Sequence, residues 1–294
     1  MLIISLLLLL FVVLGVSWYF TSGLLQPGSK DCSAEHYVFC NKPSELDLPF
    51  EDVAFQTKDG VTIRGWYING KSKNAGILLV HGSNGSRHAG LRYAPSLYEK
   101  GFNLLLIDLR NCGESEDFYD SMGFHERNDI HAGIKFLTEI KNLSSIGVFG
   151  FSMGGAAAIM AMSENPLIKA GVFESSFSDV ESVIADELKN RFRMFPNPMI
   201  SLVKSLYEKR IDGDISNLTP LIAIPRIFPR PIFIIHGTGD NKFPIIHGVK
   251  LYIAAKYPKK IWPVKNGKHA RSWQADRVRA EKEVPQYFQE HLKL

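Results

Sequence analysis

Short apolar runs alternate with helix-forming segments over most of this chain. The runs predict strands near 51–56, 62–68, 77–81, 104–108, 146–150, 170–174, 232–236 and 261–264. The segments between them predict helices near 91–100, 126–141, 153–164, 247–256 and 274–291. Such alternation is typical of an α/β fold, here a mostly parallel eight-stranded sheet with helices on both faces. The first two strands have no helix between them, which favours an antiparallel hairpin at the sheet edge.

Residues 180–230 interrupt the alternation. Two helical segments, 180–195 and 199–209, precede a proline-rich return to the next strand. An insertion at this point lies over the carboxyl ends of the sheet, so we expect a small helical lid. Its apolar residues include Phe195 and Met199, our candidate substrate-binding residues for an acyl chain. Ordinary packing of the lid on the core is the alternative.

The first 20 residues carry no charged side chain, and the first charge is Lys30. Twenty helical residues extend about 30 Å, the thickness of a bilayer core. An uncleaved single-pass transmembrane anchor is our preferred interpretation, because no basic residue precedes the run and bulky Trp18-Tyr-Phe20 occupies the place of a cleavage site. A signal peptide and a buried hairpin-like segment are the alternatives. We expect three parts: an anchor (1–20), a linker or strap (21–50) and a catalytic domain (51–294).

Charges beside the anchor do not fix its orientation. Cys32 and Cys40 are eight residues apart in the strap. Such a pair either closes a small disulfide loop outside the cytoplasm, which would make the catalytic domain extracytoplasmic, or remains two reduced thiols.

The segment Gly150-Phe-Ser152-Met-Gly154 lies between a predicted strand and an alanine-rich helix. A serine on a sharp strand-to-helix turn, between glycines that permit close packing, matches a nucleophile elbow. The N–H of Met153, at the helix N-terminus, would face a developing oxyanion. A helix-capping role for Ser152 is the alternative.

A serine nucleophile needs a base and an acid, which in this arrangement follow it in the chain. Asp240 and His269 each lie on a loop that follows a predicted strand. We expect His269 to accept the Ser152 proton and Asp240 to orient the imidazole. Glu174, also at a strand end, is a second candidate for the acid.

The second oxyanion donor is expected after the strand that ends at His81, and we choose the N–H of Ser83. A simple glycine-rich strand exit is the alternative. His81 and His236 are expected to be packed histidines. Asp108 precedes the serine, and we expect it to bond backbone or Arg110. Cys112 also precedes Ser152 in the chain, and this order argues against Cys112 as the nucleophile.

The net charge is only +4, from 34 basic and 30 acidic residues, and no long basic block occurs. Nothing here favours nucleic-acid binding. The chain has neither a phosphate-binding loop nor a Cys/His set at metal-ligand spacing, so we expect no cofactor and no metal. Composition leaves the oligomeric state open.

The ordered motifs together resemble the α/β-hydrolase superfamily from about Val53 to the C-terminus, and look like its membrane-associated Bem46 and BAAT-like serine hydrolases. The resemblance rests on the segments 58–67, 81–82, 108–115, 123–129, 150–154, 174–177, 236–240 and 268–270. It implies the fold and supports Ser152, Asp240 and His269 as the triad. Asn111 and Lys268 depart from the glycines of many relatives, which would change the shape of one loop and the charge beside the histidine.

These observations predict a membrane-anchored serine hydrolase. It would cleave an ester or thioester of a lipid or other acyl group through an acyl-enzyme. A serine peptidase or amidase is the alternative within enzymes, and a catalytically inactive binding protein is the alternative outside them.

Overall fold

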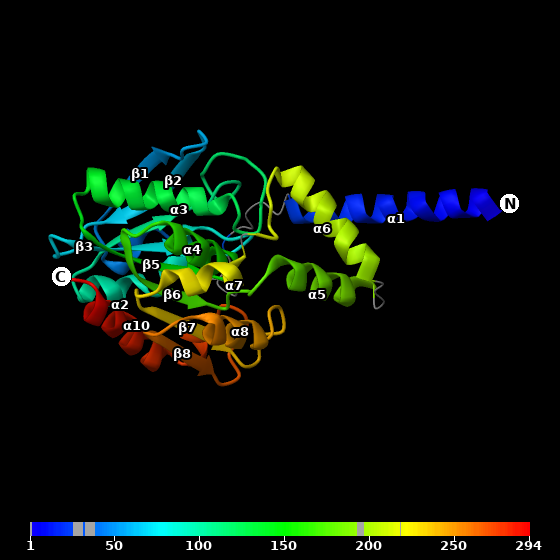
Figure 1. Ribbon diagram of the computed structural model, residues 1–294. Coiled ribbons are helices and arrows are strands. Elements are labelled where there is room, and N and C mark those ends of the chain that lie inside the picture. Colours follow the sequence, from blue (N-terminus) through cyan, green and yellow to red (C-terminus); the bar gives the residue numbers. More distant parts are fainter. Residues whose placement is uncertain (1, 26–31, 33–38, 193–196, 218) are drawn as a thin grey trace.

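The computed structural model describes residues 2–25, 32, 39–192, 197–217 and 219–294 (Figure 1). An eight-stranded sheet forms its centre, in the order β1-β2-β4-β3-β5-β6-β7-β8. The strands are β1 (Phe50–Gln56), β2 (Thr62–Ile68), β3 (Ala75–Val80), β4 (Asn103–Ile107), β5 (Ser145–Phe151), β6 (Ile168–Glu174), β7 (Ile232–Gly237) and β8 (Lys259–Val264). Each lies within two residues of its predicted start and end.

The direction of the strands also agrees with the prediction. β1 pairs antiparallel with β2, β2 pairs antiparallel with β4, and the remaining neighbours are parallel. The carboxyl ends of β3, β5, β6, β7 and β8 therefore meet at one edge, where ligands bind in open sheets of this kind.

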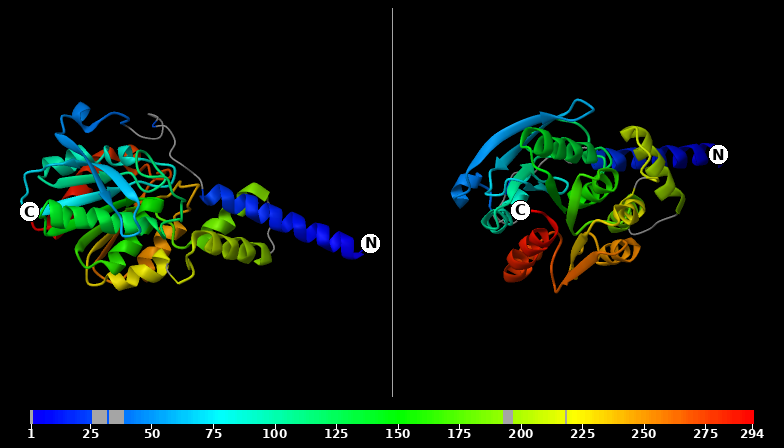
Figure 2. Two further views of the ribbon diagram at one scale, coloured as in Figure 1. Left: turned by 90° about the horizontal axis from the view of Figure 1, so that it is seen from above. Right: turned by 60° about the vertical axis from the view of Figure 1, so that its left-hand side comes forward.

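Helices cover both faces of the sheet (Figures 1 and 2). In β3, Leu78 joins one hydrophobic cluster while Ile77 and Leu79 join the other, because alternate residues of a strand face opposite sides. The first cluster is covered by α3 (Glu126–Lys135), α4 (Met153–Glu164), α7 (Pro220–Ala223) and α8 (Ile246–Ala254); the second by α2 (Ala94–Glu99), α9 (Ser272–Ala275) and α10 (Arg277–His291). Neither face of the central strands is exposed to solvent, which explains why their sequences are continuous apolar runs.

The predicted lid consists of α5 (Val180–Phe192) and α6 (Asn197–Ile211), which project from the sheet beside the N-terminal helix α1 (Leu2–Leu25) (Figure 1). Arg210 of α6 joins the two. Its Nη1 donates to Thr21 Oγ1 and Ser22 Oγ, each at 2.8 Å, and its guanidinium lies 4.1 Å from the Trp18 ring centroid. Residues 21–25, expected in the linker, are instead the last turn of α1.

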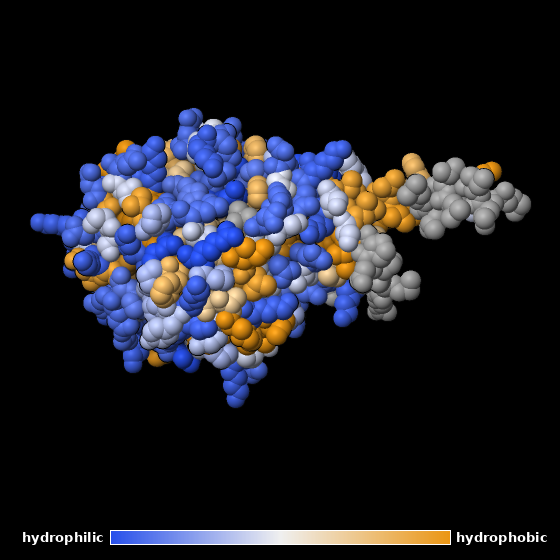
Figure 3. All heavy atoms as spheres, in the orientation of Figure 1, coloured by the Kyte–Doolittle hydropathy of each residue, from blue (hydrophilic) through white to orange (hydrophobic). Residues whose placement is uncertain are grey.

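Large apolar side chains are exposed along α1, and Figure 3 shows them on its described part next to the lid. They are Ile4, Leu8, Phe11, Val12, Leu14, Trp18 and Tyr19. Among the described residues, no helix combines the length and apolarity required of a membrane span, so the expected span is not confirmed.

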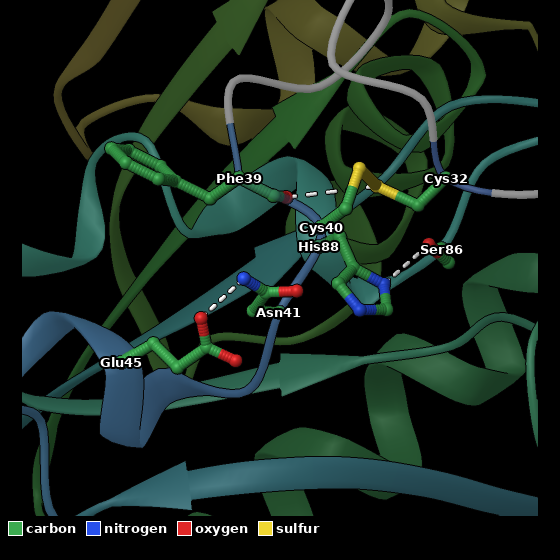
Figure 4. Close-up of a disulfide and its surroundings, with 7 residues drawn as sticks. All are labelled: Cys32, Phe39, Cys40, Asn41, Glu45, Ser86 and His88. Atoms are coloured by element: carbon green, nitrogen blue, oxygen red, sulfur yellow. Dashed lines mark hydrogen bonds between the residues drawn. A yellow bond between two sulfur atoms is a disulfide. The ribbon is translucent and has the colours of Figure 1, made fainter.

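Cys32 and Cys40 form a disulfide, with Cα atoms 5.4 Å apart (Figure 4). The sequence left open whether these cysteines form a disulfide or remain reduced thiols, and the structure has the disulfide. Beside it, Phe39 packs edge-on against Trp273 of α9, with ring centroids 6.4 Å apart. Cys32, Phe39 and Cys40 all pack against the second hydrophobic cluster, so the disulfide joins two points of the chain on that face of the sheet.

Candidate active site

Ser152 lies at a strained turn between β5 and α4. Its backbone has φ 54° and ψ −121°, a conformation that non-glycine residues rarely adopt. A Cβ on Gly150 would lie 2.4 Å from the Gly154 carbonyl oxygen, so the turn requires glycine there. The Ser152 N–H donates to the Glu174 carbonyl at 2.8 Å, which fixes the turn to β6. The Ser152 side chain accepts no hydrogen bond from the first N–H groups of α4, so Ser152 does not have the helix-capping role that was its alternative interpretation.

The structure brings Ser152, His269 and Asp240 into one hydrogen-bonded chain. His269 Nε2 is 2.8 Å from Ser152 Oγ, and His269 Nδ1 is 2.8 Å from Asp240 Oδ2. Ser152 and Asp240 are buried, while the His269 side chain is 21% exposed. An ionised carboxylate only accepts hydrogen bonds, so in neutral His269 Nδ1–H donates to Asp240 and Nε2 accepts from the Ser152 hydroxyl.

Asp240 is held as a carboxylate. Burial alone would raise its pKa, but hydrogen bonds from His269 and from the Phe243 N–H, with the histidine charges, lower it below the ordinary value. Its Oδ1 accepts from the N–H groups of Lys242 and Phe243 at 3.0 and 2.9 Å. These bonds fix the carboxylate that orients the imidazole.

His236 packs behind this carboxylate, as expected of a histidine within the sheet. It is fully buried, and burial lowers its pKa. Its Nε2 donates to the Phe243 carbonyl at 2.8 Å and lies 3.6 Å from Asp240 Oδ2. The same ring therefore supports both the loop and the carboxylate of Asp240.

The loop after β3 passes directly beside Ser152. A Cβ on Gly82 would lie 2.8 Å from the Ser152 Cβ, so only glycine permits this approach. Ser83, the next residue, lines the cavities at Ser152, and its Oγ donates to Asp120 at 3.1 Å. Met153 is the first residue of α4, where a helix leaves its N–H without an internal acceptor. The two expected oxyanion donors thus flank Ser152.

Glu174, the second candidate for the acid, does not contact His269. Its Oε1 accepts from the Ser272 N–H at 2.8 Å and its Oε2 from the Tyr93 hydroxyl at 3.2 Å. Its neighbour Ser175 accepts the Ala270 N–H at 3.0 Å. The end of β6 therefore holds both the serine turn and the loop that carries His269, a role that sequence reasoning missed.

The remaining candidates hold loops together. His81 Nε2 accepts from the Leu109 N–H at 2.9 Å. Asp108 accepts from the N–H groups of Arg87 and Glu114, as expected, but its cation is Arg87 and not Arg110. Arg110 instead pairs with Asp129 and Asp59. Cys112 is buried and burial raises the pKa of its thiol, which makes it a weak nucleophile.

Two cavities meet at Ser152. The larger, of about 460 Å³, contains His269 and is lined by Gly82, Ser83, Ala89, Arg92, Phe151, Ser152, Gly239, Asn241, Lys242, Lys268, His269, Ala270 and Arg271. The smaller, of about 160 Å³, opens toward α1 and the lid and includes Leu24, Met153, Phe177, Val183 and Phe243. The end of α1 is thus part of the site, which the prediction of a linker there did not anticipate.

Of the two predicted substrate-binding residues, only Met199 belongs to the part of the chain that the structure describes. Phe195 lies outside the described residues. Met199, in α6, packs against the first hydrophobic cluster and is not among the lining residues of either cavity. From the lid, Val183, Asp186 and Glu187 of α5 line the smaller cavity instead.

The sheet, the serine turn and the comparisons together define a class: the chain is a hydrolase of the α/β-hydrolase superfamily. Residues 77–199 match the family described as alpha/beta hydrolase fold. The esterase Pf2001 of Pyrococcus furiosus superimposes with a TM-score of 0.73 at 26% identity, over 90% of this chain and 99% of that one.

Curated relatives include two proteins of particular interest. The uncharacterized protein YqkD of Bacillus subtilis is 25% identical over 78% of this chain and 76% of its own length. The thiohydrolase aneE of Aspergillus aculeatus is 30% identical over 47% of this chain and 48% of its own.

Proposed function

We propose that the protein is a serine hydrolase that cleaves acyl esters or thioesters through an acyl-enzyme. The observation that carries the proposal is the hydrogen-bonded chain from Ser152 through His269 to Asp240, with both distances at 2.8 Å. Two similar proteins are an esterase and a thiohydrolase by name, which supports the choice of an ester or thioester bond.

The reaction follows from the positions of the groups. His269 Nε2 takes the Ser152 proton as Oγ attacks the acyl carbon, and Asp240 stabilises the imidazolium. The N–H groups of Met153 and Ser83 receive the oxyanion. His269 then returns the proton to the leaving alcohol or thiol, and water hydrolyses the acyl-enzyme by the same steps.

The acyl group occupies the smaller cavity in this proposal. Its apolar lining includes Leu24, Met122, Phe177, Val183 and Phe243, and the charged residues Asp186, Glu187 and Lys242 also line it. Each CH₂ group buried there contributes about 0.8 kcal/mol, which favours an apolar acyl chain.

We further propose that α1 attaches the protein to a membrane and that the catalytic domain is extracytoplasmic. Attachment is supported by the exposed apolar side chains of α1, among them Phe11 at 77% and Tyr19 at 73% exposure. The outer location is supported by the disulfide between Cys32 and Cys40, since such bonds persist in oxidising compartments. Sodium carbonate washing of membranes should leave the full chain in the pellet, and its release into the supernatant would contradict attachment.

Steady-state kinetics of the full chain in detergent test the hydrolase proposal. We compare hexanoyl esters, thioesters and amides that share the same leaving group. We expect kcat/KM to be far higher for the ester or the thioester than for the amide. Ser152→Ala and His269→Ala should each lower kcat by about a thousandfold or more, and Asp240→Asn by less. Equal or faster cleavage of the amide would indicate a peptidase or amidase instead.

A further inference from the structure

Arg92 is a buried cation with unused hydrogen-bond donors in the larger cavity. The residue is 4% exposed, and its Nε and Nη2 atoms donate no hydrogen bond within the described part of the chain. One face of the guanidinium lies over the Phe151 ring, 4.4 Å from its centroid. Stacking of this kind leaves the N–H groups in the guanidinium plane available. Buried donors without partners are costly, so an arginine is unusual here unless an acceptor binds to it.

The nearest carboxylate does not supply that acceptor. Glu174 Oε2 is 3.9 Å from Arg92 Nη2, beyond hydrogen-bond distance. Both oxygens of Glu174 already accept from other donors, Ser272 N–H and the Tyr93 hydroxyl. Glu174 therefore offsets part of the Arg92 charge without satisfying its N–H groups.

The rest of the cavity is also basic. Arg92, Lys242, Lys268 and Arg271 line it, and its described lining includes no aspartate or glutamate. Lys268 and Arg271 lie on either side of His269 and Ala270 in the loop that carries the histidine. The cavity surrounding the serine therefore favours a negatively charged group.

His269 identifies which part of a substrate reaches this cavity. It lines the larger cavity and not the smaller one. The leaving group takes its proton from His269 Nε2, so it must lie on that side of Ser152, while the acyl chain extends toward α1.

We propose that the larger cavity binds an anionic group, a carboxylate or a phosphate, on the leaving group of the substrate, and that Arg92 is its principal ligand. The inference rests on the proposed hydrolase function. The substrate is then an ester or thioester whose apolar acyl part faces α1 and whose alcohol or thiol carries negative charge. An arginine fork matches both carboxylate and phosphate oxygens, so the experiment has an arm for each.

The test compares matched substrates on the full chain in detergent. The first pair is the hexanoyl ester of para-hydroxybenzoate and that of its neutral methyl ester. The second pair is monohexanoylglycerol phosphate and monohexanoylglycerol. We expect kcat/KM of the wild type to be at least about tenfold higher for the anionic member of one or both pairs, and the pair that responds identifies the anion. Arg92→Gln should remove about tenfold to hundredfold from the anionic substrate and leave the neutral one within about twofold.

Two further variants make the result specific. Arg92→Lys should retain part of the preference. Lys73→Gln, which removes an exposed charge just before β3 at the opposite edge of the sheet, should retain all of it. If Arg92→Gln does not fold, Lys268→Gln combined with Arg271→Gln should reduce the same preference.

Failure of this inference can be distinguished from failure of the proposed function. Hydrolysis of both members of each pair at equal rates, or equal losses on both in Arg92→Gln, would overturn the anionic leaving group and leave the hydrolase intact. If no ester is cleaved, calorimetric titration of the Ser152→Ala variant with para-hydroxybenzoate and with glycerol phosphate tests whether the larger cavity binds an anion. Binding weakened at least about tenfold by adding Arg92→Gln supports the site, and no binding refutes it.

Discussion

Ser175 accepts a hydrogen bond from the N–H of Ala270, with 3.0 Å between Oγ and N. Ala270 follows His269 directly, and Ser175 follows the last residue of β6. The carbonyl of that residue, Glu174, receives the Ser152 N–H. One strand end therefore sets the distance between the proposed nucleophile and its base.

Removing the Ser175 hydroxyl should make the position of His269 less well defined while leaving the histidine in the site. We expect Ser175→Ala to lower kcat about tenfold, because misplacing a catalytic group affects the transition state more than substrate binding, and to leave KM nearly unchanged. Ser176→Ala is the matched control, since the buried Ser176 Oγ has no hydrogen-bond partner in the described structure. Equal rates for both variants, measured with a hexanoyl ester, would show that the bond does not position His269.

The smaller cavity should set acyl-chain length. Val183→Trp fills it from the lid, so we expect kcat/KM for an octanoyl ester to fall at least about tenfold while the acetyl ester changes by less than about threefold. Met199→Ala, on the other lid helix and outside both cavities, is the control. A series of para-nitrophenyl esters measures the profile. A parallel loss on all chain lengths in Val183→Trp would place the acyl group elsewhere.

Asp120 should make stability depend on pH. Burial and the nearby Glu126 charge raise its pKa to about 7, so between about pH 4 and 7 the folded state holds a proton that the unfolded state has lost. Unfolding free energy should therefore fall as pH rises through this window. Asp120→Asn cannot ionise, and its advantage over the wild type should grow from near zero at pH 4 to at most about 4 kcal/mol at pH 8. Urea unfolding at several pH values gives the two curves, and parallel curves would contradict the shifted pKa.

The disulfide should stabilise the strap without taking part in the reaction. The closed loop is short, so chain entropy predicts that Cys40→Ser costs about 2.5 kcal/mol of unfolding free energy. We expect kcat of the folded variant to change by less than about twofold, because neither cysteine lines a cavity at Ser152. Denaturant unfolding with and without reductant measures the cost. A loss of activity equal to that of Ser152→Ala would show that the strap shapes the site.

The strands of the sheet and the candidate triad could be predicted from the amino-acid sequence because each is marked by a short local sequence pattern. Apolar runs mark each strand, and glycines around Ser152 mark a turn that few other residues permit. His269 and Asp240 follow strands whose carboxyl ends share one edge, so topology alone brings them near the serine.

The rest depends on tertiary contacts that have no local signal. That Asp108 pairs with Arg87 and Arg110 with Asp129 depends on which loops meet over β4. The last turn of α1 lines a cavity because Arg210 fixes α1 to the lid. Arg92 lies in a segment that reads as an ordinary helix start, and only its burial over Phe151 indicates a ligand.

The central claim is that Ser152 forms the acyl-enzyme, and the site of covalent attachment tests it most directly. The full chain is treated with a fluorophosphonate, digested, and analysed by mass spectrometry to locate the adduct. We predict one phosphonylated residue, Ser152, with labelling abolished in Ser152→Ala and slowed at least about a hundredfold in His269→Ala. Labelling at another residue, or undiminished labelling of Ser152→Ala, would contradict the account.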